Sequence, residues 1–298
     1  MSKELIKKLG FNRIKLNEPL SEHTFIQAGG PADFYYEAKI SEELKEAAKA
    51  AAAEKIPFVV IGAGGNILAS DKGFRGLVIK NSSENIKFSP FDFVEVDSGV
   101  NNSELITAAK DRGLTGLERL IKVPGTVGGA IYMNAGDTAK SEFFGDLVET
   151  VAVLDQNGEV KKLGKEDCGF AYRTSRFQGS GEIILSASIQ LKQATKEEIE
   201  SKAKDVLVRK MNQPTGPSMG SIFKNPPGNF AGKLIDEAGL KGKEVGSAKI
   251  SEKHANYIIN EGSAKASDVK ALVDLAKSEV KKKFGIDLQE EIRYVGEW

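Results

Sequence analysis

Two glycine-rich loops constrain what this chain can fold into more than any other feature of its sequence. The first, IGAGGN at residues 61–66, follows an apolar run, and the second, PGTVGGAIYMNAG, covers residues 124–136. Glycine lets a backbone approach a ligand closely and point successive N–H groups at one anion. Because 42 basic and 42 acidic side chains cancel, the chain offers no general positive field for an anionic ligand. The loops therefore predict a site for the phosphates of a nucleotide cofactor.

The first loop does not follow the pattern of a Rossmann dinucleotide-binding turn. Gly62-Ala63-Gly64 supplies G-x-G, but Ile67 stands where the third glycine belongs, and the residues after it do not read as a helix. We therefore expect a nucleotide site of another kind. A plain turn between two strands remains the alternative explanation for the loop.

Composition and charge narrow the class of protein. The hydrophobic share of 40% and the charged share of 28% are typical of a soluble globular chain, and the balanced charge argues against nucleic acid or an anionic membrane as a partner. The single cysteine, Cys168, excludes an internal disulfide framework. The sequence has no apolar signal segment and no run of about 20 apolar residues. We expect a soluble, cytoplasmic protein without a metal cofactor.

Periodicity and capping signals predict mixed α and β structure. An Asn157-Gly158 pair predicts a hairpin with a type I′ turn. Thr195 and Glu198 form a capping box, which predicts a long polar helix and marks a domain boundary. The predicted strands lie at 32–38, 57–61, 74–80, 93–100, 146–163 (the hairpin), 181–191, 255–260 and 290–296, and the predicted helices at 41–55 with Ser41 as N-cap, 101–113, 195–213, 230–239 and 266–285.

A serine motif stands just after the predicted boundary. GPSMG at residues 216–220 matches the G-x-S-x-G elbow of serine hydrolases, and Asp236 and His254 follow Ser218 in triad order. An elbow serine stands between a strand and a helix, whereas Ser218 is preceded by a proline-bearing loop and followed by a short run that ends at two prolines. The hydrolase interpretation remains an alternative.

The neighbouring Ser221 fits a different use. In a short strand, Ser221 and Phe223 would share one side while Ile222 and Lys224 share the other. Ser221 would then lie at the edge of a cleft, where its hydroxyl can donate a proton. A hydrogen-bonded turn serine is the alternative.

Long motifs in a fixed order connect these observations. PGTVGGAIYMNAG, GSIFKNPPG (220–228) and SEKHANYIIN (251–260), with FAYRTSRF (170–177) between them, make the chain resemble the UDP-N-acetylenolpyruvoylglucosamine reductases over nearly its whole length. The resemblance implies an α+β fold with a two-lobed FAD-binding region of the vanillyl-alcohol-oxidase-like kind, residues 1–85 and 86–194, and an α+β substrate-binding domain, residues 195–298. It also implies the shorter type of the family, without a tyrosine-bearing insertion after FAYRTSRF.

The resemblance further implies the reaction and its ligands. NADPH would give a hydride to non-covalently bound FAD, and UDP-N-acetylglucosamine enolpyruvate would receive it on the way to UDP-N-acetylmuramic acid, a precursor of peptidoglycan. The residues implied to hold FAD are Gly62, Ala63, Gly64, Gly65, Asn66, Pro124, Gly125, Thr126, Gly128, Gly129, Asn134, Ala135 and Gly136.

Three residues match the family's catalytic positions. Arg173 would polarise the substrate carboxylate, for which a planar guanidinium is suited. Glu291 would assist the enolate, which requires a raised pKa, and Ser221 would protonate it. The residues with a weaker assignment to the substrate are Lys210, Lys224, Asn225 and His254.

Two positions depart from the family pattern. Gly65 stands where the family usually has a serine, so one donor to the FAD pyrophosphate is lost, and Glu290 stands where the family often has proline. Besides the hydrolase, a non-catalytic flavin-binding module remains an alternative to the reductase.

Overall fold

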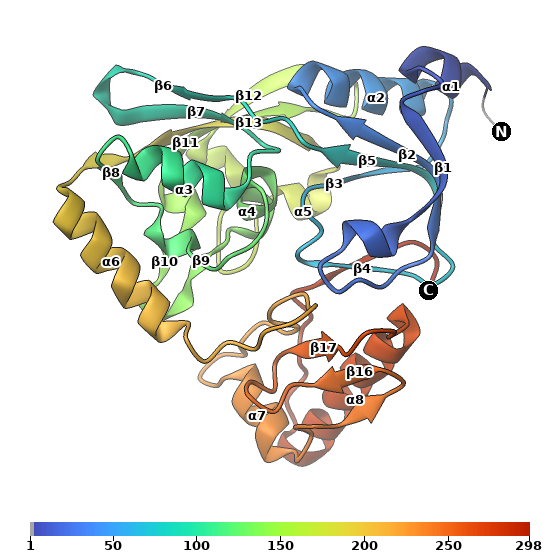
Figure 1. Cartoon of the computed structure of the whole chain (residues 1–298), viewed down its shortest axis with the longest axis vertical. Coiled ribbons are helices and arrows are strands. Elements are labelled where there is room, and N and C mark those ends of the chain that lie inside the picture. Colours follow the sequence, from blue (N-terminus) through green and yellow to red (C-terminus); the bar gives the residue numbers. More distant parts are fainter. Residues whose placement is uncertain (1–2) are drawn as a thin grey trace. The chain divides into compact units, whose positions relative to one another are not determined.

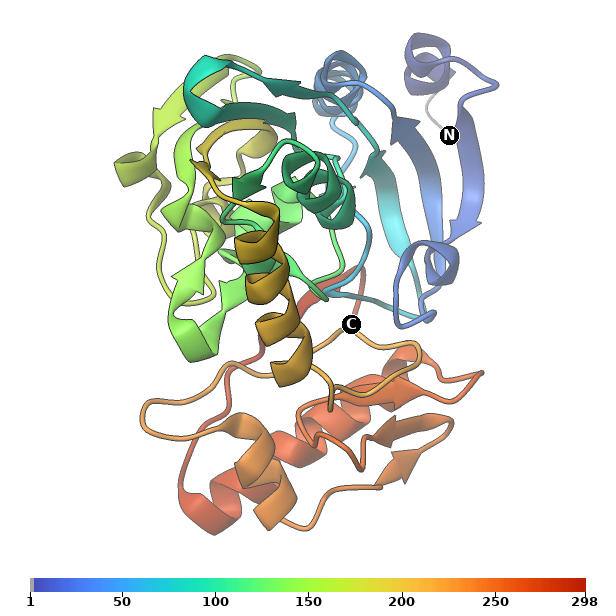
Figure 2. The ribbon, with the colours of Figure 1, turned by 60° about the vertical axis from the view of Figure 1, so that its left-hand side comes forward.

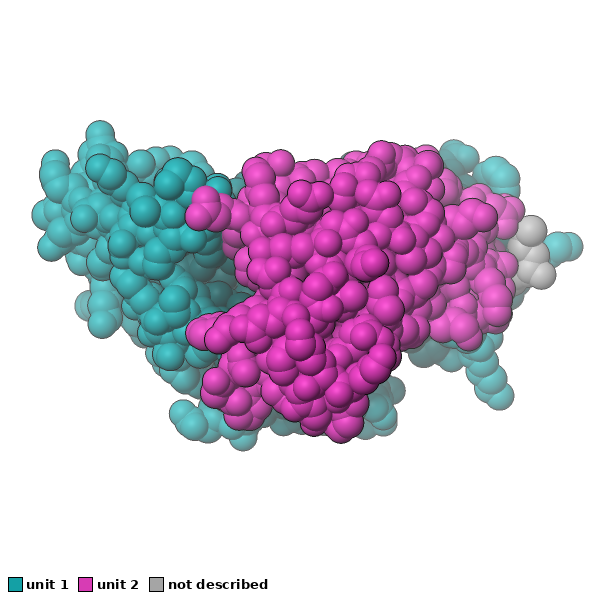
Figure 3. All heavy atoms as spheres, turned by 90° about the horizontal axis from the view of Figure 1, so that it is seen from below, with its two compact units in different colours: residues 1–14, 36–63, 78–211 teal, residues 15–35, 64–77, 212–298 magenta. Residues whose placement is uncertain are grey.

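The computed structural model describes residues 3–298 (Figure 1). Two units make up the protein (Figure 3). Unit 1 comprises Met1–Ile14, Tyr36–Ala63 and Val78–Met211, and unit 2 comprises Lys15–Tyr35, Gly64–Leu77 and Asn212–Trp298. The chain therefore passes between the units several times, and the first glycine loop is divided between them after Ala63.

The division also falls within three strands, β1 (Ile14–Pro19), β2 (Pro31–Ala38) and β5 (Phe74–Asn81), of a four-stranded sheet with the order β1-β2-β5-β3. The other elements of unit 1 are α1 Lys3–Leu9, α2 Ser41–Ala53, β3 Phe58–Ile61, β6 Ile86–Phe88, β7 Phe93–Asp97, α3 Asn102–Lys110, β8 Leu114–Thr115, α4 Val127–Met133, β9 Gly136–Asp137, β10 Glu142–Phe143, β11 Val148–Leu154, β12 Val160–Gly164, α5 Phe177–Ser180, β13 Ile183–Gln190, β14 Lys192–Gln193 and α6 Lys196–Arg209.

A five-stranded antiparallel sheet, β12-β11-β13-β7-β6, forms the centre of unit 1 (Figure 2). Its strands alternate between apolar and polar side chains, so one face is apolar. The helix α4, which follows the Pro-Gly-Thr of the second glycine loop, packs on β13 and β7 of this sheet. The core side chains of the unit include Val94, Val96, Leu105, Ile131, Phe144, Val151 and Ile189. The sheet thus gives the second glycine loop a fixed base.

Unit 2 contains a three-stranded sheet and two helices. Its elements are β4 Ile67–Ala69, α7 Ala231–Glu237, β15 Glu244–Val245, β16 Ala248–Ile250, β17 Ile258–Asn260, α8 Ala266–Phe284 and β18 Arg293–Val295. The helix α8 buries Val269, Leu272, Val273, Ala276 and Val280, a spacing of three and four residues that makes one apolar stripe. It ends at Gly285, whose φ of 71° suits the left-handed cap.

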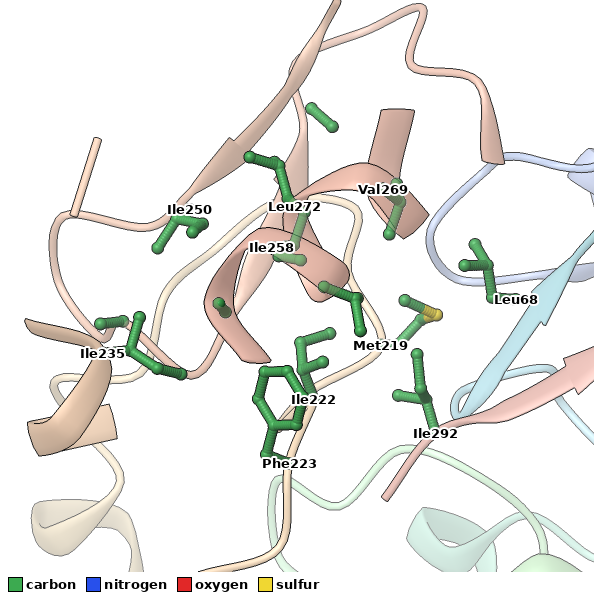
Figure 4. Packing of buried hydrophobic residues seen from close by; sticks show 14 of the residues in the cluster. Leu68, Met219, Ile222, Phe223, Ile235, Ile250, Ile258, Val269, Leu272 and Ile292 are labelled. Carbon is green, nitrogen blue, oxygen red and sulfur yellow. The ribbon is translucent and has the colours of Figure 1, made fainter. Parts of the chain in front are cut away.

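The core of unit 2 joins residues that are far apart in the chain (Figure 4). Strand β18 pairs in parallel with β4, so Arg293 lies opposite Ile67 in the ladder. Leu68 of β4 and Ile292, just before β18, belong to the same apolar cluster as Met219, Ile222 and Phe223. This cluster therefore ties the segment after the first glycine loop to the segment that carries Ser221.

The structure confirms most of the predicted elements. The capping box is present, because the Thr195 hydroxyl accepts from the Glu198 N–H at 3.2 Å and the Glu198 carboxylate from the Thr195 N–H at 2.8 Å. The hairpin of β11 and β12 is present as well. Only Gly181 and Glu182 separate α5 from β13, so no insertion follows FAYRTSRF.

Some local predictions are wrong. Ser41 is the first residue of α2 and not its cap, and its hydroxyl is 3.4 Å from the Leu185 carbonyl oxygen. The turn of the β11–β12 hairpin is not type I′, because only Gly158 of the Asn157-Gly158 pair has a positive φ. Asp155 determines this turn instead, since its Oδ1 accepts from the N–H groups of Asn157 and Glu159 at 2.9 Å.

The helix α6 clusters with unit 1, so the two units divide the chain at other positions than the predicted ranges 1–85, 86–194 and 195–298. Those domain ranges stay a prediction. In the described part of the chain, no helix is both long enough and apolar enough to span a membrane.

Candidate functional site

The two glycine loops meet within unit 1. A Cβ on Gly62 would lie 2.4 Å from the Thr126 Oγ1, closer than real side chains approach. A side chain at position 62 would force Thr126 to shift, so the bare backbone of Gly62 lies against the N-cap residue of α4 in the second loop. This contact brings two predicted cofactor-binding segments to one place. A surface made of glycine backbone next to a hydroxyl suits the close approach of a pyrophosphate.

The second loop is held at both of its ends. Thr126 is the N-cap of α4, with its Oγ1 accepting from the Gly129 N–H at 3.4 Å. The Gly128 N–H donates to the Ser98 carbonyl at 2.7 Å, and a Cβ on Gly128 would lie 2.9 Å from the Ser98 Cβ. Asn134 ends the helix in the left-handed region with φ 45°. Its amide donates to the Ala171 carbonyl at 2.9 Å, which links the loop to the segment of Arg173.

Arg173 lies in a strained turn beside the end of this loop. Ala171 and Thr174 exchange two backbone hydrogen bonds of 3.1 Å, and Arg173 between them has φ 53°. Its Nη2 is 3.4 Å from the Gly136 carbonyl oxygen and 3.3 Å from the Thr138 hydroxyl. Positive φ at a non-glycine residue is costly and is often found at functional sites. The structure thus places the predicted arginine next to Gly136 of the predicted cofactor loop.

Lys210 lies near the same loop but is already bound to backbone. Its Nζ donates to the Ile121 carbonyl at 2.6 Å. Burial lowers the pKa of Lys210 to about 8, and the positive charge of Arg173 acts in the same direction, whereas Asp137 opposes the shift. Asp137 is itself paired with Arg209 at 2.6 Å. Arg209 of α6 and Lys210 just after it therefore bring two cationic groups near Asp137.

In unit 2, Ser221 and Glu291 lie on neighbouring backbone segments. The Glu291 N–H donates to the Ile222 carbonyl at 2.8 Å, and Phe223 forms an antiparallel bridge with Glu290. The predicted short strand is absent, because the segment makes only isolated bridges. Ile222 and Phe223 are both buried, at 1% and 2% exposed.

The segment that carries Ser221 is also held by Asn256, a residue that the sequence analysis did not identify. Its Oδ1 accepts from the Phe223 N–H at 2.9 Å, and its Nδ2 donates to the Phe223 carbonyl at 2.8 Å. One buried amide thus replaces a pairing strand. The only sequence signal was an asparagine in the apolar run 255–260.

The end of the first glycine loop adjoins Glu291 in unit 2. Asn66 donates from its amide to the Glu291 carbonyl at 3.0 Å, and its own carbonyl accepts from the Arg293 N–H at 2.9 Å. Gly64 has φ 74°, and a Cβ there would lie 2.0 Å from the His23 carbonyl oxygen. Gly65 has no positive φ, so its backbone does not demand glycine. Three predicted segments, around Asn66, Ser221 and Glu291, are therefore joined in this unit.

The remaining predicted residues of unit 2 have structural partners. Glu290, the departure beside Glu291, pairs with Lys277 at 2.8 Å. Asn225 accepts from the Ala231 N–H at 3.0 Å, and the Lys224 N–H donates to the Gln289 carbonyl at 2.9 Å. His254 accepts from the Asn256 N–H at 3.2 Å, and burial lowers its pKa.

The hydrolase elbow is absent from its predicted place. Ser218 forms an isolated bridge with Ile259, and the next helix along the chain, α7, begins only at Ala231. A nucleophile elbow requires a strand before the serine and a helix directly after it. The local fold at Ser218 therefore contradicts the hydrolase alternative.

Family models match both parts of the chain. Residues 32–164 match the model of an FAD binding domain, and residues 209–295 match that of the C-terminal domain of UDP-N-acetylenolpyruvoylglucosamine reductase. A UDP-N-acetylenolpyruvoylglucosamine reductase of Caldanaerobacter subterraneus subsp. tengcongensis is 42% identical over 297 residues, 99% of this chain and 97% of that one. A second relative, UDP-N-acetylenolpyruvoylglucosamine reductase 2 of Symbiobacterium thermophilum, is 40% identical over 95% of this chain and 92% of its own.

Solved structures agree with these matches. The crystal structure of UDP-N-acetylenolpyruvylglucosamine reductase from Thermus caldophilus superposes with a TM-score of 0.81 at 36% identity, covering 95% of this chain and 98% of that one. A berberine bridge enzyme variant, a reticuline dehydrogenase, shares the fold alone, with a TM-score of 0.51 at 18% identity over 64% of this chain and 44% of its own. The fold is thus the predicted combination of an FAD-binding region and a C-terminal α+β domain, and the chain belongs to the UDP-N-acetylenolpyruvoylglucosamine reductase family.

Proposed function

We propose that this protein reduces the enolpyruvyl ether of UDP-N-acetylglucosamine enolpyruvate to UDP-N-acetylmuramic acid, with NADPH as the hydride donor and FAD as the cofactor. The observation that carries this proposal is the 42% identity over 99% of the chain to a reductase of this name. The contact of Gly62 with Thr126 supports it, because the contact joins the two loops into one surface of bare backbone.

The residues present fit FAD. Gly62 and Ala63, just after β3, and Gly125 and Thr126 of the second loop would hold the pyrophosphate through backbone N–H groups. When bound, FAD supplies the hydride transfer between NADPH and the substrate. The protein's part is to place the substrate, to stabilise the charge that develops on it and to deliver a proton.

Arg173 would bind the carboxylate of the enolpyruvyl group. Its guanidinium is permanently charged and planar, so it can hold a carboxylate with two parallel hydrogen bonds. Addition of hydride pushes negative charge toward this carboxylate, and a fixed positive charge becomes more favourable as the charge develops. The strained turn of Ala171 and Thr174 would keep the side chain in place without reorganisation.

Ser221 would protonate the carbon next to the carboxylate of the enolate-like intermediate. Glu291, with its own carboxyl group protonated, would stabilise the charge of this intermediate. A serine hydroxyl is a weak acid, but a carbanion-like carbon is a strong base, so a positioned hydroxyl suffices. The hydrogen bond from Glu291 N–H to Ile222 O supports this pairing of roles, because it keeps both segments in register. Lys210, Lys224, Asn225 and His254 remain proposed substrate contacts.

A cytoplasmic location belongs to the same proposal. The single cysteine, Cys168, is buried, and its thiol lies 3.3 Å from the Gly164 carbonyl oxygen, so it serves the core and no cross-link.

The test of the proposed cofactor is the visible spectrum of the purified protein. We expect bound flavin that is released as FAD on denaturation and bleached by NADPH without air. A protein that carries no flavin and cannot be reconstituted with FAD would rule the proposal out. Reconstitution without bleaching by NADPH would leave only the flavin-binding module.

A further inference from the structure

The second glycine loop is preceded by a turn with an unfavourable residue. The Val123 N–H donates to the Leu120 carbonyl at 2.8 Å, and Ile121 has φ −58° and ψ 131°. Lys122 follows with φ 57°, so residues 120–123 form a type II turn. A type II turn prefers glycine at the position of Lys122. This strained turn lies directly before Pro124 and Gly125.

Two side chains, one from α3 and one from the residue just after α6, hold the carbonyls on either side of Lys122. Lys210, just after α6, donates from Nζ to the Ile121 carbonyl at 2.6 Å. Asn102, the first residue of α3, donates from Nδ2 to the Val123 carbonyl at 3.1 Å. The Asn102 N–H also donates to the Gly125 carbonyl at 3.0 Å. The strained peptide is thus fixed from both ends.

Asn102 holds this turn at a cost to the fold. The residue is 2% exposed, and among the described residues its Oδ1 is buried without a hydrogen-bond partner. A buried acceptor without a donor is rare and destabilising. The alternative orientation of the amide would set Oδ1 against the Val123 carbonyl and lose the bond of Nδ2. The cost of the unpaired Oδ1 therefore indicates that the hydrogen bond from Asn102 to the Val123 carbonyl has a function.

We propose that Asn102 and Lys210 are positioning residues that clamp the type II turn at Lys122 and thereby set the affinity for FAD. The turn leads directly into Gly125 and Thr126, so its shape decides where the backbone of these two residues lies. The inference rests on the proposed use of this loop for FAD. Neither side chain needs to touch the cofactor.

The decisive experiment measures FAD affinity in the full-length holoprotein after equilibration at graded concentrations of free FAD. We expect Asn102→Ala to weaken FAD binding about tenfold, because the turn relaxes when one clamp is lost. Its thermal unfolding without FAD should change little, since the substitution also removes the unpaired Oδ1. A variant that only damaged the fold would lose stability and affinity together.

Rescue separates positioning from general damage. Glycine adopts a positive φ without strain, so Lys122→Gly in the Asn102→Ala background should restore most of the FAD affinity. Lys122→Gly should likewise restore most of the FAD affinity of the Lys210→Met variant. Asn101→Ala is the matched control, because Asn101 is exposed and makes no capping bond with its side chain, and it should bind FAD like the unaltered protein.

The outcomes distinguish this inference from the proposed function. If the unaltered protein binds FAD and Asn102→Ala binds it equally well, the clamp has no role. Failure of Lys122→Gly to improve the Asn102→Ala variant would also overturn the inference. If the unaltered protein does not bind FAD at all, the proposed function fails first.

Discussion

The Glu291 N–H donates a hydrogen bond of 2.8 Å to the carbonyl oxygen of Ile222. This bond sets the segment of Ser221 beside the segment of Glu291, although the two residues are 70 positions apart in the sequence. Both residues were proposed to act on the same enolate, one as proton donor and one as stabiliser. Their neighbouring backbones give the two roles a common frame within unit 2.

Replacement of Ser221 by alanine should separate the two halves of the reaction. We expect Ser221→Ala to leave bleaching of the flavin by NADPH nearly unchanged. Reoxidation by UDP-N-acetylglucosamine enolpyruvate should fall by about 10²–10⁴-fold, the usual contribution of a positioned acid. Stopped-flow absorbance of each half-reaction measures this directly.

Ser218→Ala is the matched control for this experiment, since Ser218 lies in the same motif but bridges to Ile259. It should have a mild effect on both half-reactions. An equal loss in both half-reactions of Ser221→Ala would contradict the proton-donor role.

Replacement of Arg173 should lower the activity of the protein without lowering its stability. Arg173→Gly removes the guanidinium and also relieves the positive φ of 53°, so the melting temperature should stay the same or rise. Reoxidation by the substrate should slow by about 10²–10³-fold, because the charge on the carboxylate loses its counter-charge. Arg173→Lys keeps the charge without the planar fork and should recover only part of the rate. Full activity of the Arg173→Gly variant would refute the role of the guanidinium.

The contact between the glycine loops predicts a steric effect on cofactor binding. Gly62→Ala should abolish retention of FAD, because its Cβ would lie 2.4 Å from the Thr126 Oγ1. Gly179→Ala is the control, since a Cβ there meets nothing within 4 Å. The flavin content per chain, read from the visible spectrum, tests both variants. A Gly62→Ala protein that purifies with a full complement of flavin would show that the loops do not form one surface.

Lys210 predicts a pH dependence of stability. Burial lowers its pKa to about 8 from the ordinary lysine value of 10.5, so between these values the unfolded chain holds a proton that the folded chain has released. Stability therefore rises with pH across this window. Across this window, the free energy of unfolding should rise by on the order of 1 kcal/mol more in the unaltered protein than in Lys210→Met. This is less than the full pKa shift implies, because the side chain is partly exposed.

Urea unfolding at several pH values between about 8 and about 10, inside this window, provides the measurement. The free energy of unfolding of the unaltered protein should rise relative to that of Lys210→Met. Parallel pH profiles of the two proteins would mean that Lys210 titrates normally.

Local signals predicted the elements that depend on neighbouring residues. The capping box of Thr195 and Glu198 and the apolar stripe of α8 are complete within one segment, so they could be read directly from the sequence. The hairpin of β11 and β12 was also predicted, but its turn type was not. Asp155 binds two N–H groups of the turn, and this bonding outweighs the preference of an Asn-Gly pair.

Features that depend on distant residues were not predictable in the same way. The short strand expected at Ser221 is absent, and the side chain of Asn256 supplies the hydrogen bonds that a neighbouring strand would make. The parallel pairing of β4 with β18 joins residues 67–69 to residues 293–295, and no local pattern indicates it. The clamp of Asn102 on Val123 likewise becomes visible only when α3 and the turn are placed together. Motif matching identified the site residues, and only the structure shows which backbone groups hold them.

The most direct measurement of the central claim is the oxidation of NADPH by the purified flavoprotein, followed by the loss of the absorbance of the reduced nicotinamide. The rate should depend on added UDP-N-acetylglucosamine enolpyruvate, with one NADPH consumed for each UDP-N-acetylmuramic acid formed. NADPH oxidation that is indifferent to this substrate, in a protein that holds FAD, would contradict the account.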